Sequence, residues 1–220
     1  MKKDFIKPSA STTTIIGSSD GPTSVFVASG KYKLSLKQQL QKKSFELRKK
    51  WYALWIKPNP HTIEEVVDYI RKKYDFIEVS RTSKKYQRLY QELRSSFIMQ
   101  YEPKLLGEYA ALPELKSQSQ EDVKEFLEKM HMRQEKANEV PEELFSLDCY
   151  FFEMQEKDIH MEIQLESHFE YIGGGTSGRK VSKFHKIYKD VYKYYGVSED
   201  DIKNHTKRYE NLLRQLAIRH

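Results

Sequence analysis

The chain has 220 residues, enough for one domain with a substantial core, and its single cysteine, Cys149, excludes an internal disulfide and so a disulfide-stapled secreted framework. The net charge is +6, and no stretch approaches the roughly 18 consecutive apolar residues of a membrane helix. We therefore expect a cytoplasmic protein without membrane insertion.

The charge is unevenly distributed along the chain. Residues 31–57 contain nine lysines and arginines against one acidic residue, and residues 173–220 contain eleven against five. Residues 102–172 contain seven basic residues against eighteen acidic ones. The basic ends could pack against the acidic centre, which we favour, or form a surface for phosphate, RNA or anionic lipid.

Two runs rich in β-branched residues, 12–16 and 23–28, begin the chain and are joined by the sequence GSSDGP. Turn chemistry between such runs predicts a β-hairpin. We expect residues 1–30 to form a separate hairpin or tag segment, and residues 31–220 to form a helix-rich α+β domain. An open edge of this hairpin could also add to the sheet of a partner protein.

The segment IIGSSDGPTSVFV, residues 15–27, resembles the Gly-Ala-Asp-Gly-Pro-Thr motif of the β subunits of sodium-pumping decarboxylases. In that family the aspartate of the motif lies within the membrane and is implicated in sodium passage, so the resemblance implies such a role for Asp20. A sodium path needs a membrane-spanning scaffold, which this sequence does not predict. We therefore interpret Asp20, Gly21, Pro22 and Thr23 as a turn leading into a strand, with ligand binding or docking as the alternative.

The middle of the chain shows helical periodicity. Residues 34–56 predict an amphipathic helix with a dense lysine and arginine face, and Thr62 with Glu65 forms a capping box that opens the next helix. A brief strand is expected at 76–79, and further helices at 83–101 and 120–136. The apolar stripe of the first helix comprises Leu36, Leu40, Leu47, Trp51 and Leu54.

The apolar period changes from 3.6 to 2 near residue 147. Segments 147–155 and 159–166 predict a second hairpin, followed by a glycine-rich loop at 173–178. Two closing helices are expected at 180–195 and 199–218, with His205 packed in the apolar stripe of the last one. The predicted fold class is α+β, a mostly helical single domain with one or two small antiparallel β-hairpins.

The glycine-rich segment follows a strand and precedes a helix, where backbone N–H groups can bind phosphate. Its spacing departs from that of a P-loop, and a flexible surface loop is the preferred interpretation. The candidate phosphate-binding residues are Gly173, Gly174, Gly175, Gly178, Arg179 and Lys180.

Alternation along 159–166 places His160, Glu162, Gln164 and Glu166 on one strand face, with His168 beyond it. Imidazole and carboxylate groups are metal ligands, so His160 and Glu162 are candidate metal residues. Successive residues on one face lie about 7 Å apart, too far for all of them to reach one ion, so we favour a solvated outer face.

Nucleic-acid binding is the remaining alternative, because basic and aromatic residues interleave in two segments. In the helix at 180–195, however, Phe184 and Tyr188 fall on a different side from Lys183, which predicts an aromatic core and a lysine-rich exterior. The candidate nucleic-acid contacts in the first helix are Lys42, Lys43, Arg48, Lys49 and Lys50.

These patterns favour a non-catalytic binding or interaction protein with a protein partner and no cofactor. The two alternatives are a basic protein that contacts nucleic acid and an enzyme that binds phosphate or nucleotide through residues 173–180. Cys149 lies in an apolar strand and is expected to be a core residue.

Overall fold

The computed structural model of the protein describes residues 13–18, 21–27, 35–117, 119–156, 159–178 and 181–218, the first two ranges as backbone only. The chain divides into two units, Met1–Leu40 and Gln41–His220, and each is described by itself.

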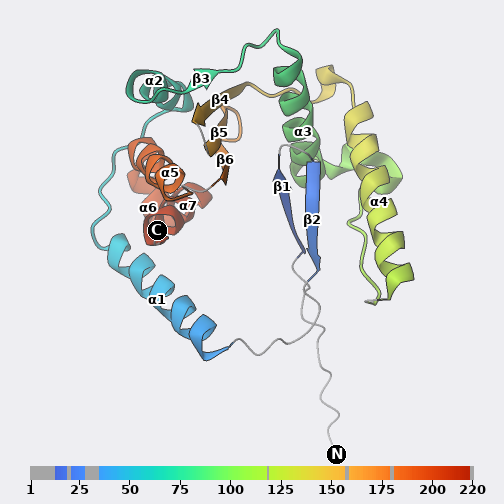
Figure 1. The fold of residues 1–220 in the computed structure, drawn as a ribbon, viewed down its shortest axis with the longest axis horizontal. Helices are drawn as coiled ribbons and strands as arrows, with labels where there is room; N and C mark the ends of the chain where they lie inside the picture. The colour runs from blue at the N-terminus through green and yellow to red at the C-terminus, as the bar shows by residue number, and fades with distance from the viewer. Residues whose placement is uncertain are drawn as a thin grey trace, which may run out of the picture. The chain divides into compact units, whose positions relative to one another are not determined.

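The first unit contains a β-hairpin, as the sequence predicts. Strand β1 (Thr13–Ser18) pairs antiparallel with β2 (Gly21–Val27), and the register shifts between Ile16 and Gly17 (Figure 1). Gly21, Pro22 and Thr23 lie in β2, so the two strands extend further toward the turn than predicted. Asp20 lies outside the described residues.

The second unit contains a four-stranded antiparallel sheet in the order β3-β4-β5-β6. The expected strands at 76–79 and in the second hairpin are confirmed. Their bounds are Ile77–Glu78 for β3, Cys149–Glu156 for β4, Ile159–Glu166 for β5 and Tyr171–Gly178 for β6.

Strand β6 corrects the expectation of a glycine-rich loop. The segment Gly173–Gly178 pairs with β5 along its length. A Cβ at Gly174 would lie 2.6 Å from the carbonyl oxygen of Glu162 and 3.1 Å from the Phe184 ring. The glycine therefore allows α5 to pack closely on β6, which the turn chemistry of the sequence does not reveal.

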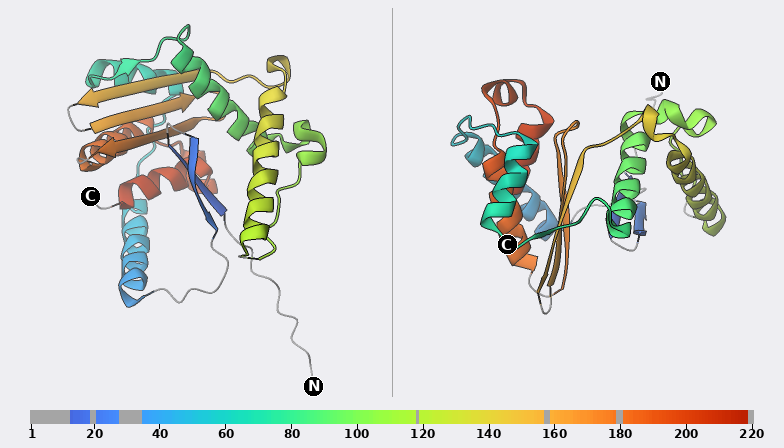
Figure 2. Two further views of the ribbon diagram at one scale, coloured as in Figure 1. Left: turned by 45° about the vertical axis from the view of Figure 1, so that its right-hand side comes forward. Right: turned by 90° about the horizontal axis from the view of Figure 1, so that it is seen from above.

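One face of the sheet packs against helices from both ends of this unit (Figure 2). Their apolar side chains and the sheet residues Met161, Ile163 and Leu165 form one core. The capping box of Thr62 and Glu65 is confirmed. The helices are α2 (Ile63–Lys73), α5 (Val181–Tyr195), α6 (Glu199–Asn204) and α7 (Lys207–Ala217).

The opposite face carries a second core around Cys149 and Phe151. The buried guanidinium of Arg94 donates to the carbonyl oxygens of Phe145 and Val140, each at 2.7 Å, and so ties the segment after α4 to α3. The elements on this face are α3 (Lys84–Tyr101), the 3₁₀ segments Pro103–Tyr109 and Glu142–Leu144, and α4 (Gln120–Glu139).

The prediction of one continuous closing helix over residues 199–218 is wrong, because the segment forms two helices, α6 and α7. His205 adopts a left-handed conformation with φ of 50° and ends α6, and Thr206 caps α7 through its side chain. The imidazole of His205 is 69% exposed, so it is not packed in the apolar stripe. The hydroxyl of Thr206 accepts a backbone N–H bond at the start of α7, as a cap requires.

The fold class is α+β and mostly helical, as predicted. Within the described ranges, no helix is both long enough and apolar enough to cross a membrane.

Candidate functional site

The part of helix α1 (Leu36–Ala53) that belongs to the second unit, residues 41–53, contacts the rest of that unit with one side. Tyr52, Ala53 and Ile56 pack against the core shared by α5 and α7. The Arg48 guanidinium donates to the carbonyl oxygen of Ala217 at 2.7 Å, and Lys49 pairs with Glu210 at 2.7 Å. These contacts fix the helix on the domain.

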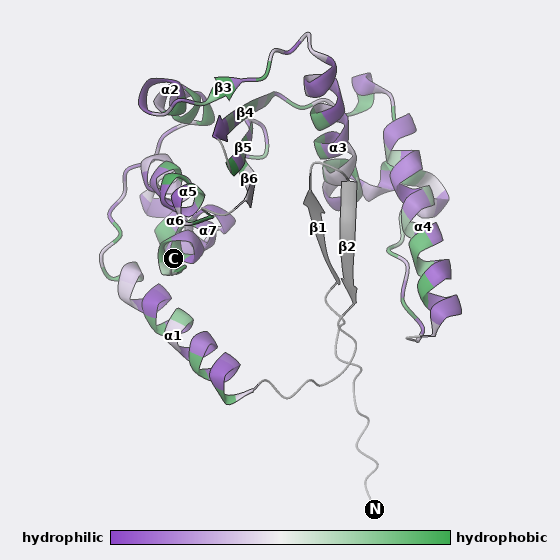
Figure 3. Ribbon diagram, viewed as in Figure 1, coloured by the Kyte–Doolittle hydropathy of each residue, from purple (hydrophilic) through white to green (hydrophobic). Residues whose placement is uncertain are grey.

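The other side of α1, together with the turn that follows it, carries large apolar side chains that the rest of the second unit does not cover. Leu47 is 67% exposed, Trp51 56%, Leu54 79% and Trp55 68%. We call these four residues the α1 apolar face. The rings of Trp51 and Trp55 lie 6.2 Å apart. Figure 3 shows apolar and strongly hydrophilic residues along the whole helix. The stripe that the periodicity predicts is therefore exposed, and a different side of α1 makes the packing contacts.

The five candidate nucleic-acid residues fall into two groups. Arg48 and Lys49 make the internal contacts described above. Lys42, Lys43 and Lys50 are exposed, and in the helical projection Lys43 and Lys50 flank the α1 apolar face, whereas Lys42 falls on the opposite side of the helix. In α5 the predicted segregation is confirmed, because Phe184 and Val191 are buried while Lys186 and Lys193 are exposed.

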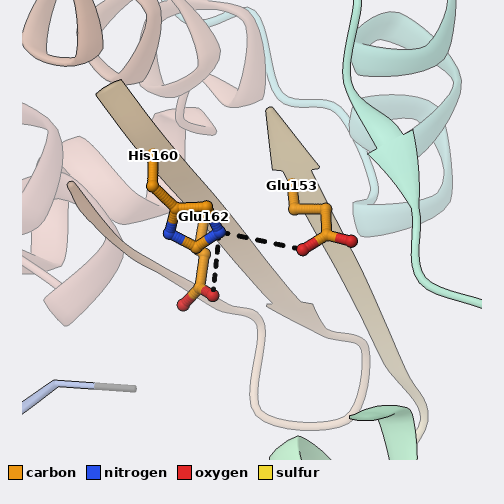
Figure 4. A group of neighbouring side chains, drawn as sticks. All are labelled: Glu153, His160 and Glu162. Atoms are coloured by element: carbon orange, nitrogen blue, oxygen red, sulfur yellow. Dashed lines mark ion pairs between the residues drawn. The ribbon is translucent and has the colours of Figure 1, made fainter. Parts of the chain in front are cut away.

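A polar cluster lies on the sheet face that also carries Cys149 and Phe151. Glu153 on β4 is directly opposite Glu162 on β5, and His160 projects from the same face two residues earlier (Figure 4). The imidazole Nε2 of His160 lies 3.7 Å from a Glu153 carboxylate oxygen and 3.6 Å from Oε1 of Glu162. One ligand atom from each residue lies within 4.8 Å of the others.

Helix α3 adds charged groups above this cluster. Lys85 Nζ donates to the Glu153 carboxylate and lies 3.9 Å from Oε1 of Glu162. Partial burial raises the pKa of Glu92 on the same helix; the charge of Arg88 opposes this effect and that of Glu162 reinforces it. The surroundings of the cluster are therefore rich in carboxylates, with Lys85 as a direct cationic partner.

The prediction of a solvated outer face on β5 is wrong for Glu166 and Glu162. Glu166 is fully buried, and its carboxylate accepts N–H bonds from Asp148, His168 and Phe169 at 3.1, 3.1 and 2.7 Å. The Glu166 carboxylate thereby stabilises the turn between β5 and β6. The carboxylate of Glu162 is 15% exposed, because α3 packs on this side of the sheet.

The sequence interpretation did not include Glu153 and Lys85 in the site. A two-residue connection between β4 and β5 sets the register, and this register alone would have placed Glu153 opposite Glu162. Lys85 comes from a helix distant in sequence, and no local pattern predicts its approach to the cluster.

The structure does not bring the candidate phosphate-binding residues together at this cluster. Gly175 lies opposite Glu162 in β6, but the N–H groups of a strand alternate in direction and do not converge on one phosphate. Arg179 and Lys180 lie outside the described residues, as does Asp20. The phosphate site and the decarboxylase-like role of the N-terminal turn thus stay predictions.

Burial raises the pKa of the Cys149 thiol, which keeps this core residue uncharged and unreactive, as expected for a structural cysteine.

Comparison with known proteins identifies no relative of the chain. No family model matches the chain, and neither a curated protein nor a solved structure shows significant similarity to it.

Proposed function

We infer that the chain is a non-catalytic interaction protein of the cytoplasm whose partner presents an acidic amphipathic helix to the α1 apolar face. The observation that carries this proposal is the exposure of Leu47, Trp51, Leu54 and Trp55 on a helix and its following turn, which are otherwise anchored to their domain. Large apolar side chains gathered on one exposed face are typical of a protein interface.

The chemistry of the face supports a helical protein partner. Leu47 and Leu54 are seven residues apart, the spacing at which one helix presents apolar side chains to another. Exposed Lys43 and Lys50 border the apolar residues and would attract acidic residues of the partner. Because Arg48 and Lys49 are engaged internally, fewer basic groups are left for a nucleic-acid backbone.

The test uses the chain as bait for affinity purification of its partner from extracts of the source cells, after these extracts have been treated with nuclease. Leu47→Gln replaces an apolar side chain of the face, and Leu144→Gln makes the same change at a site of similar exposure, 67% against 63%. We expect a protein that is retained by the wild type and by Leu144→Gln, and whose affinity for Leu47→Gln is at least about tenfold lower.

The isolated partner is then titrated into the chain while tryptophan fluorescence is followed. Both tryptophans of the chain, Trp51 and Trp55, lie on the face, so docking should shift their emission to shorter wavelength. Equal capture by the two variants, or loss of all capture after nuclease treatment, would remove the α1 apolar face from the explanation and favour a nucleic-acid function.

A further inference from the structure

We propose that Glu153, His160 and Glu162 bind one divalent ion of a first-row transition metal, with Zn²⁺ as the probe. The three side chains converge from two adjacent strands on one face of the sheet (Figure 4). The site shares no residue with the α1 apolar face, and the inference does not depend on the proposed function.

The distances among the ligand atoms suit a single ion. Ligands about 2.1 Å from a tetrahedral Zn²⁺ lie about 3.4 Å from one another. The imidazole Nε2 of His160 is 3.7 Å from the Glu153 oxygen and 3.6 Å from Oε1 of Glu162. The chosen oxygens of Glu153 and Glu162 lie within 4.8 Å of each other, so rotation of these side chains toward the ion would complete three coordination bonds. The paired strands hold the backbone of all three residues in register.

The donor set favours a transition metal over Mg²⁺ or Ca²⁺. One imidazole nitrogen with two carboxylates suits Zn²⁺ and its neighbours, whereas Mg²⁺ and Ca²⁺ prefer oxygen ligands throughout. Oε1 of Glu162 is buried and receives no hydrogen bond from any residue that the structure describes. A buried carboxylate oxygen without a donor is costly, and coordination to a cation would satisfy it.

An ion entering this site would have to displace the ammonium group of Lys85. Its ammonium group pairs with Glu153 and lies 3.9 Å from Oε1 of Glu162, so it supplies the positive charge beside the two carboxylates. The Lys85 side chain is 35% exposed and can turn toward solvent. The ion and the ammonium group would therefore compete for the same carboxylates.

One side of the site is left uncovered by the glycine-rich strand. Gly175 lies opposite Glu162, and a Cβ at Gly175 would have no atom within 4 Å. The side chains of His160 and Glu153 are 27% and 29% exposed. With three protein ligands and this open side, the ion would keep at least one coordination position for water or another small ligand, as open zinc sites do.

The experiment is isothermal titration calorimetry of the full chain with Zn²⁺, supported by the visible absorption of Co²⁺ in the same site. Glu162→Gln removes a ligand and should weaken Zn²⁺ binding by at least about tenfold. Lys85→Met removes the competing ammonium and should strengthen binding by about tenfold. Circular dichroism checks that each variant is folded.

The matched control is His131→Gln. His131 and Glu135 form another histidine–glutamate pair at 3.2 Å on α4, but they are exposed, and no third ligand group among the described residues joins them. The control should leave the Zn²⁺ affinity and the Co²⁺ bands unchanged. Absence of saturable Zn²⁺ binding to the wild type, or equal losses for His131→Gln and Glu162→Gln, would overturn the proposal. Failure of Lys85→Met to strengthen binding would also contradict the competition between the ammonium group and the ion.

Discussion

Two adjacent glycines in β6 meet different surroundings. A Cβ at Gly174 would lie 2.6 Å from the carbonyl oxygen of Glu162 and 3.1 Å from the Phe184 ring, whereas a Cβ at Gly175 would meet no atom within 4 Å. Relief of these contacts would move β5 away from β6 and α5 away from the sheet. Gly174→Ala should therefore lower the free energy of unfolding by about 1–3 kcal/mol. Gly175→Ala should change it by less than about 0.5 kcal/mol. Urea denaturation measures both, and equal effects would contradict the described packing of α5 on β6.

At the scale of elements, Asp190 on α5 joins that helix to α2. Its carboxylate accepts hydrogen bonds from Tyr69 at 2.6 Å, Lys73 at 2.7 Å and Tyr74 at 2.5 Å. Partial burial opposes ionisation, but these three donors outweigh it and hold the pKa of Asp190 below its usual value. The carboxylate therefore stabilises the fold in its charged form.

The expected result is that Asp190→Ala lowers the free energy of unfolding by about 1–3 kcal/mol near neutral pH. Because the folded pKa is lowered, this contribution is fully present above the unfolded pKa of about 3.9 and is lost as the pH falls through the folded value. The difference between wild type and variant should thus shrink in acid. The measurement is urea titration at neutral and at acidic pH. Asp75→Ala, at an exposed position, is the control at each pH. A difference that does not depend on pH would contradict the charged role of Asp190.

At the scale of the whole molecule, both tryptophans of the chain are exposed, Trp51 on α1 and Trp55 in the turn that follows it. Unfolding should therefore change the wavelength of tryptophan emission little, while the far-ultraviolet circular dichroism of the helices is lost. A urea titration followed by both signals measures this. Native emission at short wavelength that moves to longer wavelength on dilution would instead show that a second copy covers the α1 apolar face.

The charge blocks of the chain are partly joined in the folded second unit. Lys183 pairs with Glu156, and Arg208 lies 3.6 Å from Glu170, so basic residues near the C-terminus contact the acidic centre. Lys42, Lys43 and Lys50 of the other basic block are exposed. The expectation that the basic ends pack on the centre thus describes the C-terminal region better than α1.

Much of the fold could be predicted because its signals are local. The capping box of Thr62 and Glu65 begins α2, and the alternation from Ile159 to Glu166 is β5. The glycine-rich strand could not be predicted, because the role of Gly174 is to leave room for the Phe184 ring, a contact between different elements. Of the candidate metal site, the sequence indicated His160 and Glu162, whereas Glu153 depended on strand register and Lys85 on the packing of α3.

The sequence by itself determined the helix-rich α+β class, the β4–β5 hairpin and the apolar residues of α1, since periodicity and turn chemistry act over a few residues. Only the tertiary structure decided which side of α1 is buried. Leu47 and Trp51 form the clearer apolar stripe, yet Tyr52, Ala53 and Ile56 meet the core. The reason is that periodicity reports which side chains are apolar, while the surfaces of α5 and α7 determine which of them can be covered. In the same way, pairing between β4 and β5 brings Glu153 to His160 and Glu162, because register sets their proximity, and the packing of α3 adds Lys85.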